Sequence, residues 1–404
     1  MITRRKTLLM GGAALTLGLS VGCQSERMEA ERMTITPGQA RLLTQADGSR
    51  VSDLSGAYEG RAFTLDSPFR IASISKLLVG ELARRLHADG SLDLDADVSA
   101  IIDFPLRHPQ FPNTPVTLRR LIAHQSGIID PDVYWMTAPG NIRTLLTDKI
   151  WEADVEPGKG FRYSNLNYGI AATVMEATTQ TRFDQLFTDY VAKPLGLDIG
   201  FNWAGVSAEK RALGFPALRG ASTEWELQID GTETLSGSEP AILKEDGWSM
   251  DDYVPGTNGT LFSPQGGLRA SVNDLAVIGR EIVLKQPDLW TPGWRASDTD
   301  GRGSESEIIE GRSSEDGHFL AFGEGVYVYP EGPLPGQIDT PWVGHHGEAY
   351  GVYCGLWVVP ERQQIFVHAD LGSPDDGSPM MGGVPNQTEL ATNALRWAIQ
   401  RMAG

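Results

Sequence analysis

A serine and a lysine stand one helical turn apart in the stretch "FRIASISKLLVGELARR", residues 69–85. Residues at positions i and i+3 of a helix share a face, so the amino group of Lys76 can reach the hydroxyl of Ser73. A hydroxyl is a poor nucleophile at neutral pH and needs a base beside it. Lys76 can be that base only if burial or a neighbouring cation lowers its pKa from about 10.4. The pair therefore predicts nucleophilic catalysis at the start of a helix, where an unpaired N–H can face developing negative charge.

Two other serine patterns do not support a nucleophile. A second S-x-x-K, "SAEK" at 207–210, lies in a polar segment with no apolar helix after it. The pattern G-x-S-x-G occurs as "GLSVG" at 18–22, inside an apparent export signal where no nucleophile turn can form. Ser73 is therefore the predicted nucleophile.

A tyrosine and an asparagine follow in "PGKGFRYSNLNYG". Tyr163 and Asn165 are spaced i, i+2 in what reads as an extended loop, so their side chains can point the same way. A tyrosine beside a cation can pass protons, and an amide can bind a substrate carbonyl or hold a lysine. Taken alone, the two residues could equally pack against the core and cap the next helix.

Two histidines and a glycine enter a strand in "GHHGEAYG", residues 344–351. His345 and His346 place titratable groups beside Gly347, where another segment must approach the backbone closely. A metal site is disfavoured, because adjacent strand residues face opposite ways and no acidic or cysteine cluster accompanies them at ligand spacing. We predict neither a metal nor any other cofactor.

The elements that would position these residues can be read from periodicity. Leucines at helical spacing predict a helix over 74–88, and "VTLRRLIAHQSG" predicts one that is capped by Thr117 and stopped by Gly127. Near the end of the chain "GVYCGLWVVP" and "IFVHADLG" read as strands, followed by a helix for which Thr388 is a possible cap. Strands at both ends around a helical middle predict an α+β fold: an antiparallel sheet flanked by helices, with an inserted all-helical lobe.

The first residues predict export. Residues 1–22 combine a basic start, a short apolar run and small residues before Cys23, and "TRRKTLL" is similar to a twin-arginine signal. "LSVGC" is similar to a lipobox, which predicts lipidation at Cys23, with a plain cleaved signal as the alternative. Residues 23–33 read as a tether. We therefore expect a protein of the periplasm or cell envelope that contacts the membrane only through a lipid on Cys23.

Residues 34–404 form the predicted hydrolase domain. Its sheet-containing lobe spans about 34–109 and 255–404, and its helical lobe about 110–254. The polar stretches at 203–262 and 290–340 are predicted to be long loops or insertions.

Composition limits the partners and the redox chemistry. A net charge of −18 without a basic stripe argues against nucleic acid. The 2 cysteines can form no disulfide if Cys23 is lipidated or removed, and Cys354 in an apolar run is predicted to be a buried small hydrophobe. The expected partner is a small-molecule or peptide-like substrate.

Taken together, "SISK" (73–76), "YSN" (163–165) and "HHG" (345–347) resemble the motifs of the serine β-lactamase and penicillin-binding-protein superfamily, in its class C-like branch. That branch also contains D,D-peptidases and family VIII carboxylesterases. The landmarks "LRRLIAHQSG", "PLGL" and "PQGGLRASVNDLAVIG" resemble family patterns as well, so the likeness covers most of residues 60–370.

The resemblance implies a role for each motif residue. Ser73 would be acylated, and Lys76 and Tyr163 would shuttle the proton to the leaving group and then activate the deacylating water. Asn165 would orient the substrate. The backbone N–H groups of Ser73 and Glu348 would form the oxyanion hole.

The third motif departs from the family pattern. Where β-lactamases of this branch carry K-T-G, the residues here are His345, His346 and Gly347, which are expected to bind substrate. His124 is expected to be a buried structural histidine, and the "PQGG" glycines to be tight-turn residues. An unperturbed imidazole is only about one quarter protonated at pH 7, so the counter-charge for a substrate carboxylate is weakened.

These features predict a cofactor-free serine hydrolase that cleaves an ester or amide through an acyl-enzyme, and they favour a carboxylesterase. A D,D-peptidase, a D-aminopeptidase and a weak β-lactamase are the alternatives within the same class. A non-hydrolysing binding or sensor protein on the same fold is the alternative from another class.

Overall fold

The computed structural model describes most of the chain after the predicted tether. The described residues are 36–221, 224–228, 247–290, 294–295, 321–330, 332–334, 340–349, 351–372 and 389–402. The predicted export signal, the tether with Cys23, and Thr388 lie outside them. None of the helices in these ranges is both long enough and apolar enough to span a membrane.

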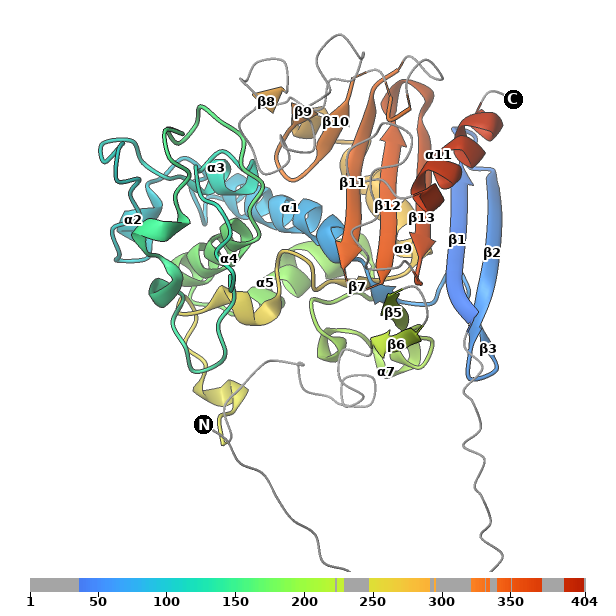
Figure 1. The fold of residues 1–404 in the computed structure, drawn as a ribbon, viewed down its shortest axis with the longest axis horizontal. Helices are drawn as coiled ribbons and strands as arrows, with labels where there is room; N and C mark the ends of the chain where they lie inside the picture. Colours follow the sequence, from blue (N-terminus) through green and yellow to red (C-terminus); the bar gives the residue numbers. More distant parts are fainter. Residues whose placement is uncertain are drawn as a thin grey trace, which may run out of the picture. The chain divides into compact units, whose positions relative to one another are not determined.

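A nine-stranded antiparallel sheet forms the centre of the fold, in the order β3-β2-β1-β13-β12-β11-β10-β9-β8 (Figure 1). The first strands of the chain pair directly with the last, because β1 lies against β13. The predicted α+β fold with an antiparallel sheet is therefore confirmed. Its strands are β1 (Thr36–Thr44), β2 (Arg50–Tyr58), β3 (Arg61–Ala62), β8 (Trp294–Arg295), β9 (Ala321–Phe322), β10 (Tyr327–Tyr329), β11 (Trp342–Ala349), β12 (Val352–Val359) and β13 (Gln364–Asp370).

Most of the helices lie in the chain between β4 (Phe69–Arg70) and β7 (Arg269–Ala270), which pair with each other. One further helix follows β7, and another follows β13. They are α1 (Ser75–Ala88), α2 (Val98–Ile101), α3 (Leu118–Ile122), α4 (Leu166–Thr179), α5 (Phe183–Phe187), α6 (Lys193–Leu195), α7 (Ala208–Arg211), α9 (Val272–Ile278) and α11 (Glu389–Met402). The inserted segment also contains a two-stranded sheet of β5 (Ala217–Ala221) and β6 (Glu224–Gln228). The lobe predicted to be all-helical is therefore not purely helical.

Two helix predictions can be compared with the structure. The helix expected over 74–88 is α1, preceded by the short 3₁₀ turn η1 (Ala72–Ile74). The hydroxyl of Thr117 accepts the N–H of Arg120 at 3.2 Å, as expected of a cap, but α3 ends at Ile122 and does not continue to Gly127. The reason is that His124 has a φ of +55°, in the left-handed region, where an α-helix cannot continue.

Side chains alternate between two cores, one on each face of the sheet. Along β12, Leu356 and Val358 join the larger core, which also contains α1 and α9. Trp357 and Val359 join the second core beneath α11, so α9 and α11 cover opposite faces (Figure 1). This alternation holds the middle strands rigidly between two layers.

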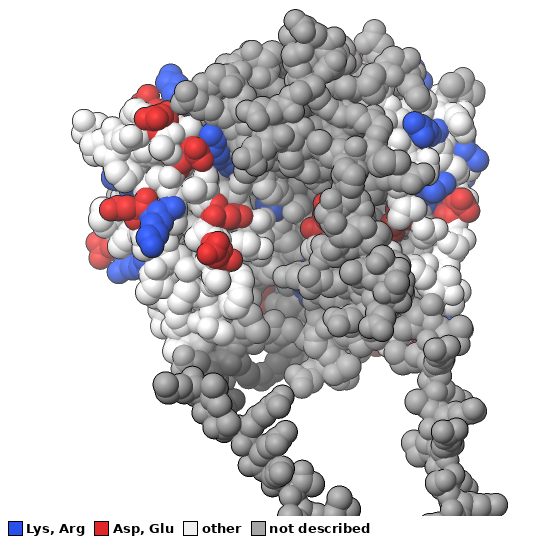
Figure 2. Space-filling view, viewed as in Figure 1, with Lys and Arg blue, Asp and Glu red and all other residues white. Residues whose placement is uncertain are grey.

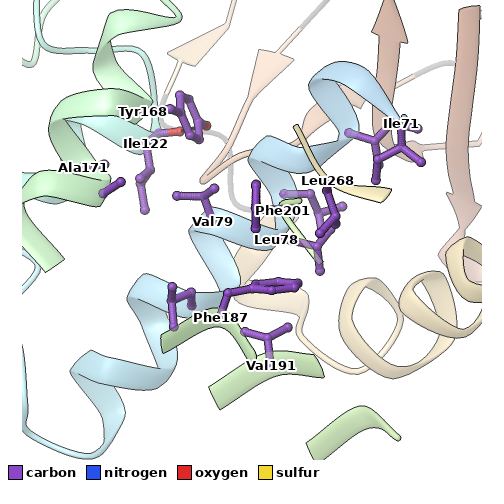
Figure 3. Packing of buried hydrophobic residues seen from close by; sticks show 14 of the residues in the cluster. Ile71, Leu78, Val79, Ile122, Tyr168, Ala171, Phe187, Val191, Phe201 and Leu268 are labelled. Atoms are coloured by element: carbon purple, nitrogen blue, oxygen red, sulfur yellow. Dashed lines mark hydrogen bonds between the residues drawn. The ribbon is translucent and has the colours of Figure 1, made fainter. Parts of the chain in front are cut away.

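Helix α1 lies inside the larger core, where helical and sheet segments meet. Figure 3 shows Leu78 and Val79 of α1 among apolar side chains of the helical segment, including Ile122 and Phe187. Most of α1 is buried, including its first turn, while its last two residues, His87 and Ala88, are exposed. A first turn packed in this way gives the residues at the start of the helix little freedom to move.

The surface of the described residues is mixed in charge. Figure 2 shows acidic and basic side chains intermingled on the described parts of the face drawn there. Of the two stretches predicted to be insertions, 203–262 contains β5, β6 and short helical turns, and 290–340 lies mostly outside the described residues.

Candidate active site

The predicted nucleophile stands on a sharp turn between β4 and α1. Ala72 has a φ of +46°, so the chain bends immediately before Ser73. Its neighbours Ala72 and Ile74 are buried, whereas Ser73 is half-buried, so the turn presents that side chain to solvent. Left-handed backbone at a residue with a Cβ costs about 1–2 kcal/mol, which the surrounding packing must offset.

Lys76 is buried and is held by three acceptors. Its Nζ donates to Ser73 Oγ at 3.0 Å, to Asn165 Oδ1 at 2.9 Å and to the carbonyl of Gln265 at 2.8 Å. The amide and carbonyl oxygens can only accept, so they occupy two N–H groups and direct the third position at Ser73. In the neutral amine that position is a lone pair aimed at the serine hydroxyl. The geometry therefore suits proton transfer from Ser73 to Lys76.

Tyr163 completes the predicted cluster. The centre of its half-buried ring lies 4.7 Å from Lys76 Nζ, and the ring stacks on that of His124 with 4.3 Å between their centres. Asn165 is not extended but begins α4 in right-handed helical conformation. Two roles were considered for this amide, binding a substrate carbonyl and holding the lysine. The structure shows the second, because the side chain accepts a hydrogen bond from Lys76.

His124 has the structural role expected of it. It is fully buried, and its Nδ1 accepts the N–H of Ser164 at 3.1 Å. Burial, aided by the charge of Lys76, holds the pKa of His124 well below its usual range, so the imidazole is neutral. The ring supports Tyr163 and takes no part in ion pairing.

Two further groups at the site were not found from the sequence. Gln265, in the "PQGG" turn, contributes its backbone carbonyl to the contact with Lys76. The turn is tight, as predicted, since the N–H of Gly267 donates to the carbonyl of Ser263. Asp130 binds the segment around Asn165 through both of its carboxylate oxygens. Neither group stands at a fixed spacing from Ser73 or Lys76, so no motif could have indicated it.

Strand β11 packs closely against the nucleophile turn at Gly347. A Cβ at this position would lie 2.3 Å from the carbonyl oxygen of Ile71 and 2.9 Å from Sγ of Cys354, so only glycine fits. This is the close backbone approach predicted for the motif. The predicted oxyanion donors lie next to this contact in the chain: Ser73 is two residues after Ile71, and Glu348 directly follows Gly347. Cys354 is buried, as predicted.

His345 and His346 are both buried, which changes their expected charge. Burial, with the charge of Lys76 adding to it, holds the pKa of His345 well below its usual range, and burial lowers the pKa of His346 to about 3. The expected partial protonation of an unperturbed imidazole therefore does not apply, and both rings are neutral at pH 7. In this structure His345 Nδ1 donates to the carbonyl of His346.

The two imidazoles are not separated by the strand as expected. Their ring centres lie 5.5 Å apart, and both rings contact Tyr327. Within the described ranges no group of three or more His, Cys, Asp or Glu side chains is arranged to hold a metal ion. Contact between these histidines and a substrate stays a prediction.

The second S-x-x-K is a helix cap. The hydroxyl of Ser207 accepts the N–H of Lys210 at 3.2 Å at the start of α7 and donates to Asp198. The side chain of Lys210 forms an ion pair with Asp274. The sequence pattern is the same as at Ser73, but its surroundings make it structural.

Comparison with known proteins gives a family match and several relatives. A family model described as "Beta-lactamase" matches residues 26–369. The D-alanyl-D-alanine-carboxypeptidase/endopeptidase AmpH of Escherichia coli is 30% identical over 142 residues, which cover 33% of this chain and 36% of that protein. Esterase EstB of Burkholderia gladioli is 30% identical over 188 residues, which cover 41% of this chain and 46% of that protein. The match therefore spans less than half the length of either relative.

Solved structures share the fold. A penicillin-binding protein homologue from Pyrococcus abyssi has a TM-score of 0.61 at 18% identity, covering 91% of this chain and 74% of that one. A class C beta-lactamase has a TM-score of 0.59 at 14% identity, covering 90% of each chain. At such identities the likeness concerns the fold alone.

Proposed function

Because the chain belongs to the beta-lactamase family, we propose that it is a serine hydrolase that cleaves neutral esters through a covalent acyl-enzyme on Ser73. The observation that carries this proposal is the position of Lys76. Two obligate acceptors fix its amino group so that the remaining position faces Ser73 Oγ at 3.0 Å.

The proposed reaction proceeds in two transfers. Ser73 Oγ attacks the substrate carbonyl while its proton passes to Lys76 or, by way of it, to Tyr163. The N–H groups of Ser73 and Glu348 stabilise the oxyanion, and Tyr163 returns the proton to the departing alkoxide. Water then attacks the acyl carbonyl, gives its proton to the same pair, and Ser73 leaves with that proton.

Asn165 would also meet the substrate. Its Oδ1 is occupied by Lys76, and one hydrogen of Nδ2 points to Asp130. The second hydrogen of Nδ2 would donate to a carbonyl on the acyl side of the substrate, since the residue is half-buried and accessible.

The preference for neutral esters rests on charge. With His345 and His346 neutral, the third motif offers no cation to a substrate carboxylate. Similarity to EstB, named an esterase, supports the same reading. Similarity to AmpH, named a D-alanyl-D-alanine carboxypeptidase, supports a peptidase acting on D-amino-acid amides as the alternative.

The test combines labelling with a substrate screen. A fluorophosphonate should label the parent and the Ser207→Ala variant but not Ser73→Ala, and p-nitrophenyl butyrate should be hydrolysed faster than a D-alanine amide or a chromogenic cephalosporin. Activity that survives in Ser73→Ala would refute the mechanism. Faster cleavage of the D-amino-acid amide would favour the peptidase. A lasting adduct without hydrolysis of any substrate would favour the sensor.

A further inference from the structure

We propose that Asp130 is a positioning residue: it fixes the orientation of the Asn165 amide and thereby aims Lys76 at Ser73. The inference rests on the proposed function, because its readout is the hydrolysis assigned to Ser73. Asp130 lies in the loop between α3 and α4, 35 positions before Asn165 in the chain.

Four donors converge on the carboxylate of Asp130. Its Oδ1 accepts the hydroxyl of Ser164 at 2.7 Å and the N–H of Leu166 at 2.8 Å. Its Oδ2 accepts the backbone N–H of Asn165 and the side-chain Nδ2 of Asn165, both at 2.9 Å. The carboxylate thus binds the start of α4 and the side chain of Asn165 at once.

The chemistry of the partners leaves the Asn165 amide one orientation. A carboxylate accepts only, so the NH₂ end of the amide must face Asp130. The carbonyl end then faces Lys76, whose Nζ donates to Oδ1 at 2.9 Å. If the amide rotated by half a turn, its NH₂ end would face the lysine donors and its oxygen would face a carboxylate. Asp130 therefore makes the amide an acceptor at the position where Lys76 needs one.

The effect reaches the nucleophile through Lys76. Asn165 Oδ1 and the Gln265 carbonyl hold Nζ in place while it contacts Ser73 Oγ, so a change in the Asn165 amide alters the direction of that contact. The negative charge of Asp130, one amide away, also favours the ammonium form of Lys76. Removal of that charge has two consequences: the amide loses its fixed orientation, and the neutral base forms at lower pH.

The same two segments are joined by a bond that can serve as a control. The hydroxyl of Ser126 donates to Asn167 Oδ1 at 2.8 Å, linking the loop before Asp130 to α4 in the buried interior. Within the described part of the chain, the side chains of Ser126 and Asn167 form no hydrogen bond with Lys76 or Asn165. If Asp130 acts only by joining the loop to α4, Ser126→Ala should impair activity in the same way.

The experiment measures kcat and KM for p-nitrophenyl butyrate from pH 5 to 10, together with thermal unfolding, in Asp130→Asn and Ser126→Ala. We expect Asp130→Asn to lower kcat by about 10²-fold, the cost of misplacing a reacting group by about 1 Å, with KM changed less than threefold. The acidic limb of the plot of kcat against pH should move to lower pH in this variant. Ser126→Ala should keep kcat within threefold of the parent, with an unmoved pH profile, even where its melting temperature falls.

A double-mutant cycle keeps the proposal testable if Asp130→Asn is unstable. In an Asn165→Ala background, Asp130→Asn should lower kcat by less than a further threefold, because the amide through which Asp130 acts is gone. The proposal is overturned if the two losses multiply, if Asp130→Asn retains full kcat, or if Ser126→Ala loses as much. Activity in Ser73→Ala would instead overturn the proposed function, so the two failures can be told apart.

Discussion

The neutrality of His345 leads to a quantitative prediction for His345→Lys. In the parent, burial holds the pKa of His345 well below its usual value of 6.5, so the ring is uncharged at neutral pH. The profile of kcat/KM against pH should therefore contain no inflection from this residue between pH 5 and 8. A lysine has an ordinary pKa about four units above that of histidine, so at the same place it would carry a positive charge at pH values where the imidazole is neutral.

The size of the effect follows from the geometry. The ring centre of His345 lies 6.4 Å from that of Tyr163. A unit charge at that separation is worth about 2.6 kcal/mol at an effective dielectric constant of about 20, or about 2 pKa units. The added cation favours the tyrosinate form of Tyr163 and disfavours the ammonium form of Lys76. Both changes make the deprotonated base available at lower pH.

The assay compares His345→Lys, His345→Gln and the parent on p-nitrophenyl butyrate from pH 5 to 10, with melting temperatures recorded for each. The acidic limb should move down by about 1–2 pH units in the lysine variant only. Hydrolysis of a carboxylate-bearing cephalosporin should rise relative to that of the neutral ester. A folded His345→Lys protein whose limb coincides with that of the glutamine variant would refute the placement of this residue beside the reacting groups.

Four further outcomes are expected. Lys76→Ala and Tyr163→Phe should each lower kcat by about 10²–10⁴-fold in ester hydrolysis, the usual loss for an acid–base group, while the proteins stay folded. Gly347→Ala should slow fluorophosphonate labelling by at least about tenfold, because its Cβ would push β11 from the nucleophile turn. Burial raises the pKa of Glu176 to about 7 from 4.5, so its contribution to stability is full below about pH 4.5 and is lost as the pH rises through 7. Glu176→Gln should accordingly flatten the melting temperature between pH 5 and 8, and an unchanged slope would contradict the assignment. Cys23→Ala should release the protein from the membrane fraction if that cysteine is lipidated, and fractionation would show persistent attachment if it is not.

The sequence by itself determined the features that depend on neighbours along the chain. Helical spacing brought Ser73, in the 3₁₀ turn η1, and Lys76, in the first turn of α1, together, because residues i and i+3 lie one turn apart in either kind of helix. The polar surroundings of Ser207 separated a helix cap from a nucleophile. The apolar runs near the end of the chain also predicted β12 and β13, and strands at both ends predicted the antiparallel sheet.

The tertiary structure decided which distant groups meet these residues and what charge they carry. Asp130 and the carbonyl of Gln265 reach the site through loops, whose paths depend on how α1, α4 and β7 pack and on no local spacing. The left-handed turn at His124 shortened α3 where the pattern favoured a longer helix. His345 is neutral because many segments together exclude water from it, and desolvation is a property of the whole packed interior. A motif can therefore name the residue at 345, but only the fold gives it its charge.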